Sequence, residues 1–260
     1  MITLLTDFGL ADYFVGAVKG AMLSIHPGAH LIDLSHEVPP HDIQFAAFTL
    51  AACAKEFPAR TVHFVVVDPG VGSERRPIVV EAADRLFVGP DNGFFTHIYH
   101  ADSRAQVFHA TQTELFRPHS GDTFHGRDIF APLAAHLDRG LAAERVGPAI
   151  TDYIQLADLV SRPRIHTNEI IGSVIHIDRF GNCVTNLTDE HLSFGDQASI
   201  EIDGRVRITR LTHNYSAAAD SRNDPIAYMG SVGYWEIGMW CTSAAEKLGI
   251  ARGMEVRLKL

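Results

Sequence analysis

Cysteine is scarce in this chain, and it has neither long apolar runs nor blocks of one charge. The 260 residues include only three cysteines, Cys53, Cys183 and Cys241, which lie far apart. This number and spacing argue against a disulfide framework and a paired-cysteine metal site, so we expect buried free thiols. No apolar run approaches the ~20 residues of a membrane span, and the first residues lack the basic and apolar regions of a secretory signal. We therefore expect a cytoplasmic protein.

Acidic residues outnumber basic residues. The chain has 31 Asp and Glu against 22 Lys and Arg, which gives a formal net charge of −9 at pH 7. This negative charge is spread along the chain, which argues against nucleic acid or an anionic membrane as the main partner and is compatible with a cationic small ligand. Hydrophobic residues make up 46% of the chain and charged residues 20%, a composition that excludes disordered and collagen-like proteins.

The first half of the chain alternates apolar runs with amphipathic stretches. This pattern is typical of β-α units that build a sheet covered by helices, so we expect an α/β sandwich with a largely parallel sheet. The expected elements are strands at 2–5, 30–34, 62–67, 78–82 and 86–88, crossover helices around 13–22 and 43–51, and a helix at 128–139.

The regular pattern lapses around 148–168, where prolines and scattered polar residues indicate a linker. Short alternating runs follow and predict a smaller, mostly antiparallel β domain. We therefore expect an N-terminal domain at 1–158, a linker at 159–168 and a C-terminal domain at 169–260. The expected strands of the second domain are 170–177, 197–202, 205–210, 226–229, 234–239 and 254–260, with one short helix near 242–248.

Two aspartates directly follow predicted strands. A carboxylate at Asp7 can accept two hydrogen bonds from the vicinal diol of a sugar, although a helix or turn cap explains it equally well. Asp68 is separated from Arg75 by a glycine turn that can fold one toward the other. Such a pair is a fixed electrostatic device, with a surface ion pair at a hairpin as the alternative. The turn lacks the glycine pattern of a phosphate loop.

Two further segments have side chains suited to chemistry. His125 precedes a predicted helix, and the ordinary histidine pKa of about 6.5 suits acid-base work. The chain has 15 histidines, so a structural or exposed role is the alternative, and neither an HxH nor an HExxH zinc motif appears. Asp178 and Asn182 flank a Phe-Gly turn that offers a carboxylate, an amide and a ring for stacking. A plain β-turn has the same residues.

Short motifs occur in a fixed order along nearly the whole chain. They are Thr6-Asp7-Phe8-Gly9, Tyr13-Phe14-Val15-Gly16, Lys19-Gly20, His36-Glu37-Val38-Pro39-Pro40, Val67-Asp68-Pro69-Gly70-Val71-Gly72, Pro90-Asp91-Asn92-Gly93, Thr123-Phe124-His125-Gly126-Arg127-Asp128 and Asp178-Arg179-Phe180-Gly181-Asn182. Together they resemble the S-adenosylmethionine hydroxide adenosyltransferases, or S-adenosylmethionine hydrolases, which are relatives of fluorinating and chlorinating enzymes. The ordered set is far more specific than any single motif.

The resemblance implies hydrolysis of S-adenosyl-L-methionine to adenosine and L-methionine, by in-line attack of water or hydroxide on ribose C5′, with no cofactor and no metal. It also implies a C-terminal β-barrel-like domain and a homotrimer, with each site between one subunit's N-terminal domain and its neighbour's C-terminal domain. The residues that match family positions are Asp68, Arg75 and His125 for the attacking water, Asp7 for the ribose hydroxyls, Asn182 for the adenine, Asp178 with Ser231 for the methionine end, and Glu236 for a further substrate contact.

Three alternatives stay open at this point: a non-catalytic S-adenosylmethionine sensor, a generic nucleoside-binding domain and a nucleophilic halogenase. The chain keeps the full Asp-Arg-His set without an obvious N-terminal-domain insertion, which disfavours both the sensor and the halogenase. A carboxylate facing the nucleophile repels a halide by roughly 4 kcal/mol at about 4 Å and an effective dielectric constant near 20. Trp235, Gly238 and the 239–242 run depart from the family pattern near the expected adenine position.

Overall fold

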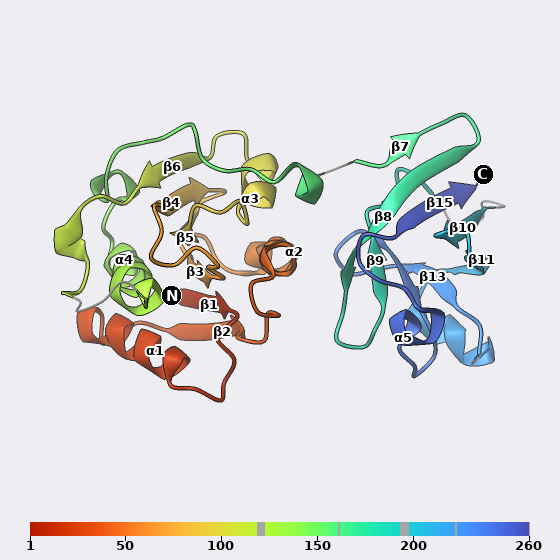
Figure 1. Ribbon diagram of the computed structural model, residues 1–260, viewed down its shortest axis with the longest axis horizontal. Helices are drawn as coiled ribbons and strands as arrows, with labels where there is room; N and C mark the ends of the chain where they lie inside the picture. Colours follow the sequence, from red (N-terminus) through yellow and green to blue (C-terminus); the bar gives the residue numbers. More distant parts are fainter. Residues whose placement is uncertain (119–122, 161, 193–197, 222, 260) are drawn as a thin grey trace. The chain divides into compact units, whose positions relative to one another are not determined.

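The computed structural model describes residues 1–118, 123–160, 162–192, 198–221 and 223–259. The chain forms two compact units, Met1–Val160 and Ser161–Leu260 (Figure 1). The segment expected to be a linker, 159–168, includes the short strand β7 (Arg164–Ile165). Among the described residues, none of the helices combines the length and hydrophobicity that a membrane crossing requires.

The first unit is built on a six-stranded sheet with the order β2-β1-β3-β5-β4-β6. Strands β2, β1, β3 and β5 run parallel, whereas β4 pairs antiparallel with both β5 and β6. The predicted largely parallel sheet is therefore confirmed. The strands are β1 (Ile2–Thr6), β2 (Leu31–Ser35), β3 (Val62–Val66), β4 (Pro77–Ala82), β5 (Arg85–Pro90) and β6 (Gln106–His109).

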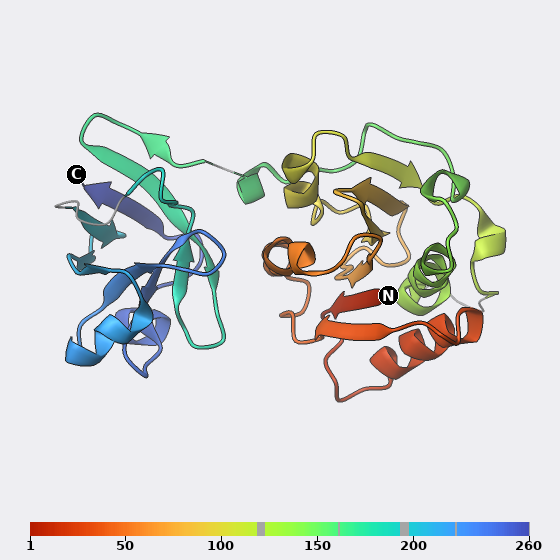
Figure 2. The same cartoon turned by 180° about the vertical axis from the view of Figure 1, so that it is seen from behind.

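Helices cover both faces of this sheet (Figures 1 and 2). Successive residues of β3 point into opposite cores. Phe64 packs with α1 and α4, and Val65 packs with α2 and α3. Burial on both faces explains why the 62–67 run is almost continuously apolar. The helices and short turns are α1 (Phe14–Ile25), α2 (Ile43–Cys53), η1 (Ala54–Glu56), α3 (Thr96–Ala101), η2 (Thr113–Leu115), η3 (Gly126–Phe130), α4 (Ala131–Asp138), η4 (Ala143–Arg145) and η5 (Ala157–Val160).

The second unit is a nine-stranded, mostly antiparallel sheet that is nearly closed and barrel-like, as predicted. Its long strand β8 pairs with β7, with β15 and with β9, and the pairing with β9 has an irregularity between Val174 and His176. One pair, β12 and β13, is parallel. Besides β7, the elements are β8 (Glu169–Ile177), β9 (Cys183–Thr185), β10 (Ser199–Ile202), β11 (Val206–Ile208), β12 (Leu211–Thr212), η6 (Tyr215–Ser221), β13 (Ile226–Met229), β14 (Trp235–Gly238), α5 (Ala244–Leu248) and β15 (Glu255–Lys259).

The cysteines differ from the expectation of three buried thiols. Cys183 is buried, Cys53 is half-buried and Cys241 is exposed. Burial raises the pKa of Cys53 to about 11 and that of Cys183 to about 12. Cys241 lies beyond the end of β14 with left-handed backbone, φ 49°, so its side chain is not carried into the core by strand alternation.

A buried histidine lies at the centre of the parallel sheet. His63, on β3, is 0% exposed, its Nδ1 lies 2.7 Å from Thr3 Oγ1, and its ring stacks on Phe87. Burial, with a smaller contribution from Arg85, lowers the pKa of His63 to about 4. The unfolded chain, in which a histidine pKa is about 6.5, therefore binds more protons in this range. Stability falls as the pH drops from about 6.5 to about 4.

We predict that His63→Leu flattens this acid dependence. Between pH 7 and pH 5, protonation of His63 in the unfolded chain should cost the wild type about 2 kcal/mol of unfolding free energy. The variant should lack this part of the change, whatever its stability at pH 7. Urea unfolding at the two pH values measures the difference, with His166→Leu as the control at an exposed histidine. Equal pH dependence in wild type and His63→Leu would contradict the assignment.

Candidate active site

The candidate residues of the first unit follow the carboxyl ends of its parallel strands. Asp7 follows β1, Asp68 follows β3 and Asn92 follows β5. Parallel strands end at the same sheet edge, which is where open α/β sheets bind ligands. Asn92 Nδ2 donates a 2.8 Å hydrogen bond to the carbonyl of Val67 and so joins the loops after β5 and β3.

Asp68 and Arg75 form a buried ion pair at this edge. The intervening turn is closed by Ser73, whose backbone N–H and hydroxyl both donate to the carbonyl of Gly70, at 3.0 and 2.7 Å. Arg75 Nε lies 3.0 Å from each Asp68 carboxylate oxygen, and Nη2 also donates to Oδ2. The side chain of Arg75 is only 9% exposed and that of Asp68 only 6%. The alternative of a surface ion pair is therefore wrong.

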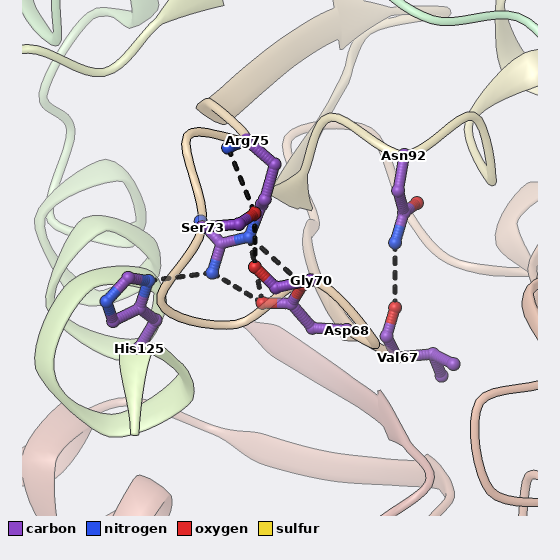
Figure 3. A network of polar contacts seen from close by, with 7 residues as sticks. All are labelled: Val67, Asp68, Gly70, Ser73, Arg75, Asn92 and His125. Carbon is purple, nitrogen blue, oxygen red and sulfur yellow. Dashed lines mark hydrogen bonds and ion pairs between the residues drawn. The ribbon is translucent and has the colours of Figure 1, made fainter. Parts of the chain in front are cut away.

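His125 completes a three-residue cluster (Figure 3). Arg75 Nη2 lies 2.7 Å from His125 Nδ1, and the guanidinium lies over the ring of Phe130 at 5.1 Å. A guanidinium has only donors and does not deprotonate in proteins, so Nδ1 must be the acceptor. The neutral imidazole then has its proton on Nε2, which makes the opposite edge of the ring a hydrogen-bond donor.

A π-helical turn follows His125. The expected helix at 128–139 divides into η3, with π geometry, and α4. Gly126 begins η3 and allows close packing, because a Cβ atom there would lie 3.1 Å from the ring of Phe8. Buried Asp128 accepts two 2.7 Å hydrogen bonds from Arg127. Single π turns within helices occur frequently at functional sites.

A cavity of about 260 Å³ lies at this edge of the sheet. Its polar lining includes Asp7, Asp68 and His125. One wall is aromatic: the ring of Phe124 lies 6.0 Å from that of Phe8 and 5.3 Å from that of Phe14. Apolar rings beside convergent polar groups are typical of small-molecule sites.

Asp7 is largely buried in this cavity, with a side chain 10% exposed. Its Oδ2 accepts a 2.9 Å hydrogen bond from the backbone N–H of His41. This hydrogen bond links Asp7 to a distant loop, and the helix that follows Asp7 has Tyr13 at its N-cap position with no side-chain cap. The expected alternative, a cap of that helix by Asp7, is therefore not what the structure shows. A carboxylate has roughly four acceptor positions, so Asp7 retains capacity for a ligand.

The neighbouring arginine faces other partners. Arg76 donates to Asp91 and to Asp152, with a shortest distance of 2.7 Å to each carboxylate. The fold thus brings Arg75, and not Arg76, to Asp68. Within the described ranges, no group of three or more His, Cys, Asp or Glu side chains is arranged to hold a metal ion.

Asp178 and Asn182 lie together in the second unit. Asp178 Oδ1 accepts hydrogen bonds from the backbone N–H groups of Phe180 and Asn182, and Oδ2 accepts from the Asn182 side chain, all at 2.8 Å. This is the hydrogen-bonded turn foreseen as the alternative, yet both residues also line a cavity of about 620 Å³. Phe180, Tyr215 and Tyr228 line it too, and Phe180 is 77% exposed.

Ser231 and Glu236 are not among the described residues that line this cavity. Ser231 is exposed in the turn after β13. Glu236 lies on β14 beside Gly230. Burial raises the pKa of the Glu236 carboxyl; a hydrogen bond with Tyr228 opposes this shift, and Asp178 adds to it. Glu236 therefore contacts Tyr228, and Tyr228 in turn lines the cavity.

Sequence reasoning missed the aromatic residues of the first cavity and, apart from Phe180, those of the second. Phe8, Phe14 and Phe124 lie inside motifs whose polar members attracted attention, so their clustering was available as a signal. Tyr215 and Tyr228 are isolated aromatic residues in the β domain. Nothing in the pattern distinguishes them from ordinary core residues.

Fold and site together define a two-domain protein with a buried Asp-Arg-His cluster at the carboxyl edge of a parallel sheet. Residues 2–147 match the model of the SAM hydroxide adenosyltransferase N-terminal domain, and residues 172–257 match that of the C-terminal domain. The chain belongs to the SAM hydroxide adenosyltransferase family.

Relatives of known name cover nearly the whole chain. It is 38% identical to the (R)-S-adenosyl-L-methionine hydrolase of Thermus thermophilus over 98% of this chain and 97% of that protein. It is 33% identical to the hydrolase of the same name from Methanocaldococcus jannaschii, over 96% and 92%. A fluorinase of Nocardia brasiliensis is 23% identical over 100% and 97%. A crystal structure of an uncharacterized conserved protein from Thermotoga maritima is similar with a TM-score of 0.91 and 34% identity, over 100% of both chains.

Proposed function

We propose that this chain hydrolyses S-adenosyl-L-methionine to adenosine and L-methionine. The Asp68-Arg75-His125 cluster beside the cavity is the observation that carries the proposal. Relatives named as hydrolases are 33–38% identical over nearly the full length, whereas a fluorinase is only 23% identical. The net charge of −9 is compatible with a cationic sulfonium substrate.

The nucleophile is the part of this reaction that needs help. Attack on ribose C5′ forms a C–O bond and breaks the C–S bond, and the sulfonium leaves as a neutral thioether that needs no proton. Bulk water has a pKa of about 15.7 and is a poor nucleophile. Holding a nucleophile at about 3–3.5 Å in line with its target supplies ~7–11 kcal/mol.

Arg75 and His125 would present donors to a hydroxide; His125 lines the cavity, and Arg75, which is not among the described lining residues, lies next to His125. Arg75 is held by Asp68, and His125, because its Nδ1 accepts from Arg75, has its N–H at Nε2. These donors stabilise hydroxide relative to water, and the proton of a bound water leaves to solvent. Hydroxide and sulfonium then give two neutral-centred products, adenosine and methionine. His125 is a hydrogen-bond donor in this scheme, and it is not the base.

Electrostatic repulsion of a halide by Asp68 is weaker than the sequence suggested. The expected repulsion assumed a lone carboxylate, but Asp68 is paired with Arg75, which balances its charge. Hydrolysis is preferred over halogenation chiefly because the named hydrolases are the more similar relatives. A sensor is disfavoured because all three residues of the cluster are present and in contact.

We assign substrate contacts on the same basis. Asp7 would hold the ribose hydroxyls, since its carboxylate lines the cavity and retains acceptor capacity. Asn182 would read the adenine through its carbonyl oxygen, because its amide nitrogen is engaged by Asp178. Asp178 would face the methionine end. Ser231 and Glu236 rest on the family resemblance alone. The homotrimer and the cytoplasmic location belong to the same proposal.

Incubation with S-adenosyl-L-methionine in ¹⁸O-water should give methionine and adenosine labelled at the 5′-oxygen. Mass spectrometry of both products provides the measurement. Intact substrate after long incubation would instead indicate a sensor. A 5′-halogenated nucleoside formed in the presence of chloride or fluoride would indicate a halogenase.

Two substitutions at His125 distinguish a donor from a base. Gln has a carbonyl that can accept from Arg75 and an amide N–H that can replace Nε2–H, so His125→Gln should stay within about tenfold of the wild-type kcat. His125→Ala should lose roughly 100-fold or more, as removal of one donor to a developing charge commonly does. KM should change little in both. If His125→Gln is as inactive as His125→Ala, His125 acts as the base.

A mixing experiment tests sites shared between subunits. His125→Ala and Asn182→Ala, each of low activity at low substrate concentration, should regain activity when co-expressed. One subunit then supplies an intact His125 and its neighbour an intact Asn182. Light scattering should give the mass of a trimer. If every site is formed by a single chain, the mixed sample stays as inactive as its parents.

A further inference from the structure

A chain of polar side chains lies behind Asp7, outside the Asp-Arg-His cluster. Thr6 Oγ1 lies 2.7 Å from His36 Nδ1, and His36 Nε2 lies 3.0 Å from Asp33 Oδ1, although its N–H is poorly aligned for a hydrogen bond. Lys19 Nζ donates a 2.7 Å hydrogen bond to the other oxygen of Asp33. Thr6 and His36 are 1% and 4% exposed, whereas Lys19 and Asp33 are partly exposed. This series of polar side chains therefore runs from the surface into the core.

The donors and acceptors in this series of side chains favour one tautomer of His36. Thr6 Oγ1 accepts from the backbone N–H of Phe8 at 3.3 Å, and its hydroxyl can donate to His36 Nδ1 when the imidazole proton is on Nε2. That tautomer turns the Nε2–H toward the carboxylate of Asp33, 3.0 Å away. Burial acts to raise the pKa of Asp33, but the hydrogen bond from Lys19 and the nearby His36 ring outweigh burial and lower that pKa. Asp33 is therefore anionic and favours this tautomer.

The same histidine also holds the backbone on the far side of Asp7. The N–H of Gly9 donates a 2.8 Å hydrogen bond to the carbonyl of His36. The loop that begins at His36 returns to Asp7, whose Oδ2 accepts from the N–H of His41. One neighbouring loop therefore contacts Thr6 before Asp7, Gly9 after it, and the Asp7 carboxylate itself.

We propose that His36 is a positioning residue that, through Thr6 and Gly9, holds the Asp7 carboxylate in the orientation that a ribose diol requires. The inference rests on the role of Asp7 in the proposed function. A carboxylate binds two vicinal hydroxyls only when both oxygens face them, so a small rotation loses one hydrogen bond. His36 itself need not touch the substrate.

The fold contains a matched control for this pair. Thr3 Oγ1 lies 2.7 Å from His63 Nδ1 in the same sheet, so both pairs join a β1 threonine to a buried histidine. Thr3 and His63 pair across β1 and β3 and do not line the cavity of Asp7. Thr3→Val and Thr6→Val each remove a hydroxyl that contacts a buried histidine, and Thr6→Val also removes the acceptor of the Phe8 N–H. Only Thr6→Val should affect recognition of ribose.

The test compares binding of adenosine and 2′-deoxyadenosine by calorimetry, which does not depend on turnover. The wild type should prefer adenosine, and Asp7→Ala should abolish that preference. Thr6→Val and His36→Leu should reduce the preference roughly tenfold, the usual worth of one hydrogen bond to a charged group. Thr6→Ser, which keeps the hydroxyl, and Thr3→Val should stay within about threefold of the wild type.

Each result bears on the proposal. It is overturned if Thr6→Val retains the wild-type preference, if Thr3→Val loses it equally, or if Asp7→Ala leaves it unchanged. Should His36→Leu fail to fold, the comparison of Thr6→Val with Thr6→Ser still decides. Failure of the hydrolysis assay alongside these binding results would refute the proposed reaction and leave the positioning role of His36 intact.

Discussion

Placement of one guanidinium at the carboxyl edge of the parallel sheet is the interaction on which the proposed chemistry depends. Arg75 satisfies the buried carboxylate of Asp68 and donates to His125. A buried charge is costly unless it is paired and hydrogen-bonded, so each member of the cluster constrains the others. The permanent charge of Arg75 also dictates the tautomer of His125, and with it the proposed role of that ring as a donor.

The parallel sheet determines where this cluster forms. Strands β1, β3 and β5 deliver their following loops to one edge, and side chains then join these loops: Asn92 binds the carbonyl of Val67, and Thr6 contacts His36. Helices on the two faces of the sheet pack against it and form two apolar cores. A rigid scaffold with hydrogen-bonded loops suits a reaction in which orientation of the nucleophile supplies much of the rate enhancement.

The cavities of the two units differ in their chemistry. The first has carboxylates, an imidazole and an aromatic wall in a cavity of about 260 Å³. The second has a carboxylate-amide pair among Phe180, Tyr215 and Tyr228 in a cavity of about 620 Å³. Rings that stack and an amide that reads a base edge are suited to a nucleobase. Carboxylates in both units are suited to a ligand that is cationic at sulfur and at its amino group.

The sequence by itself determined the alternation of strands and helices, the largely parallel sheet, the barrel-like second unit and the family, because apolar periodicity and ordered motifs are local properties. Tertiary structure alone decided that Arg75 rather than Arg76 meets Asp68, that a π turn follows His125, that Ser231 does not line the second cavity, and that His36 supports the loop of Asp7. The contact of Thr6 with His36 joins residues 30 positions apart, and that of Arg75 with His125 joins residues 50 positions apart. The choice of Arg75 over Arg76 depends on the direction of a single side chain. Only packing in three dimensions sets such distances and directions.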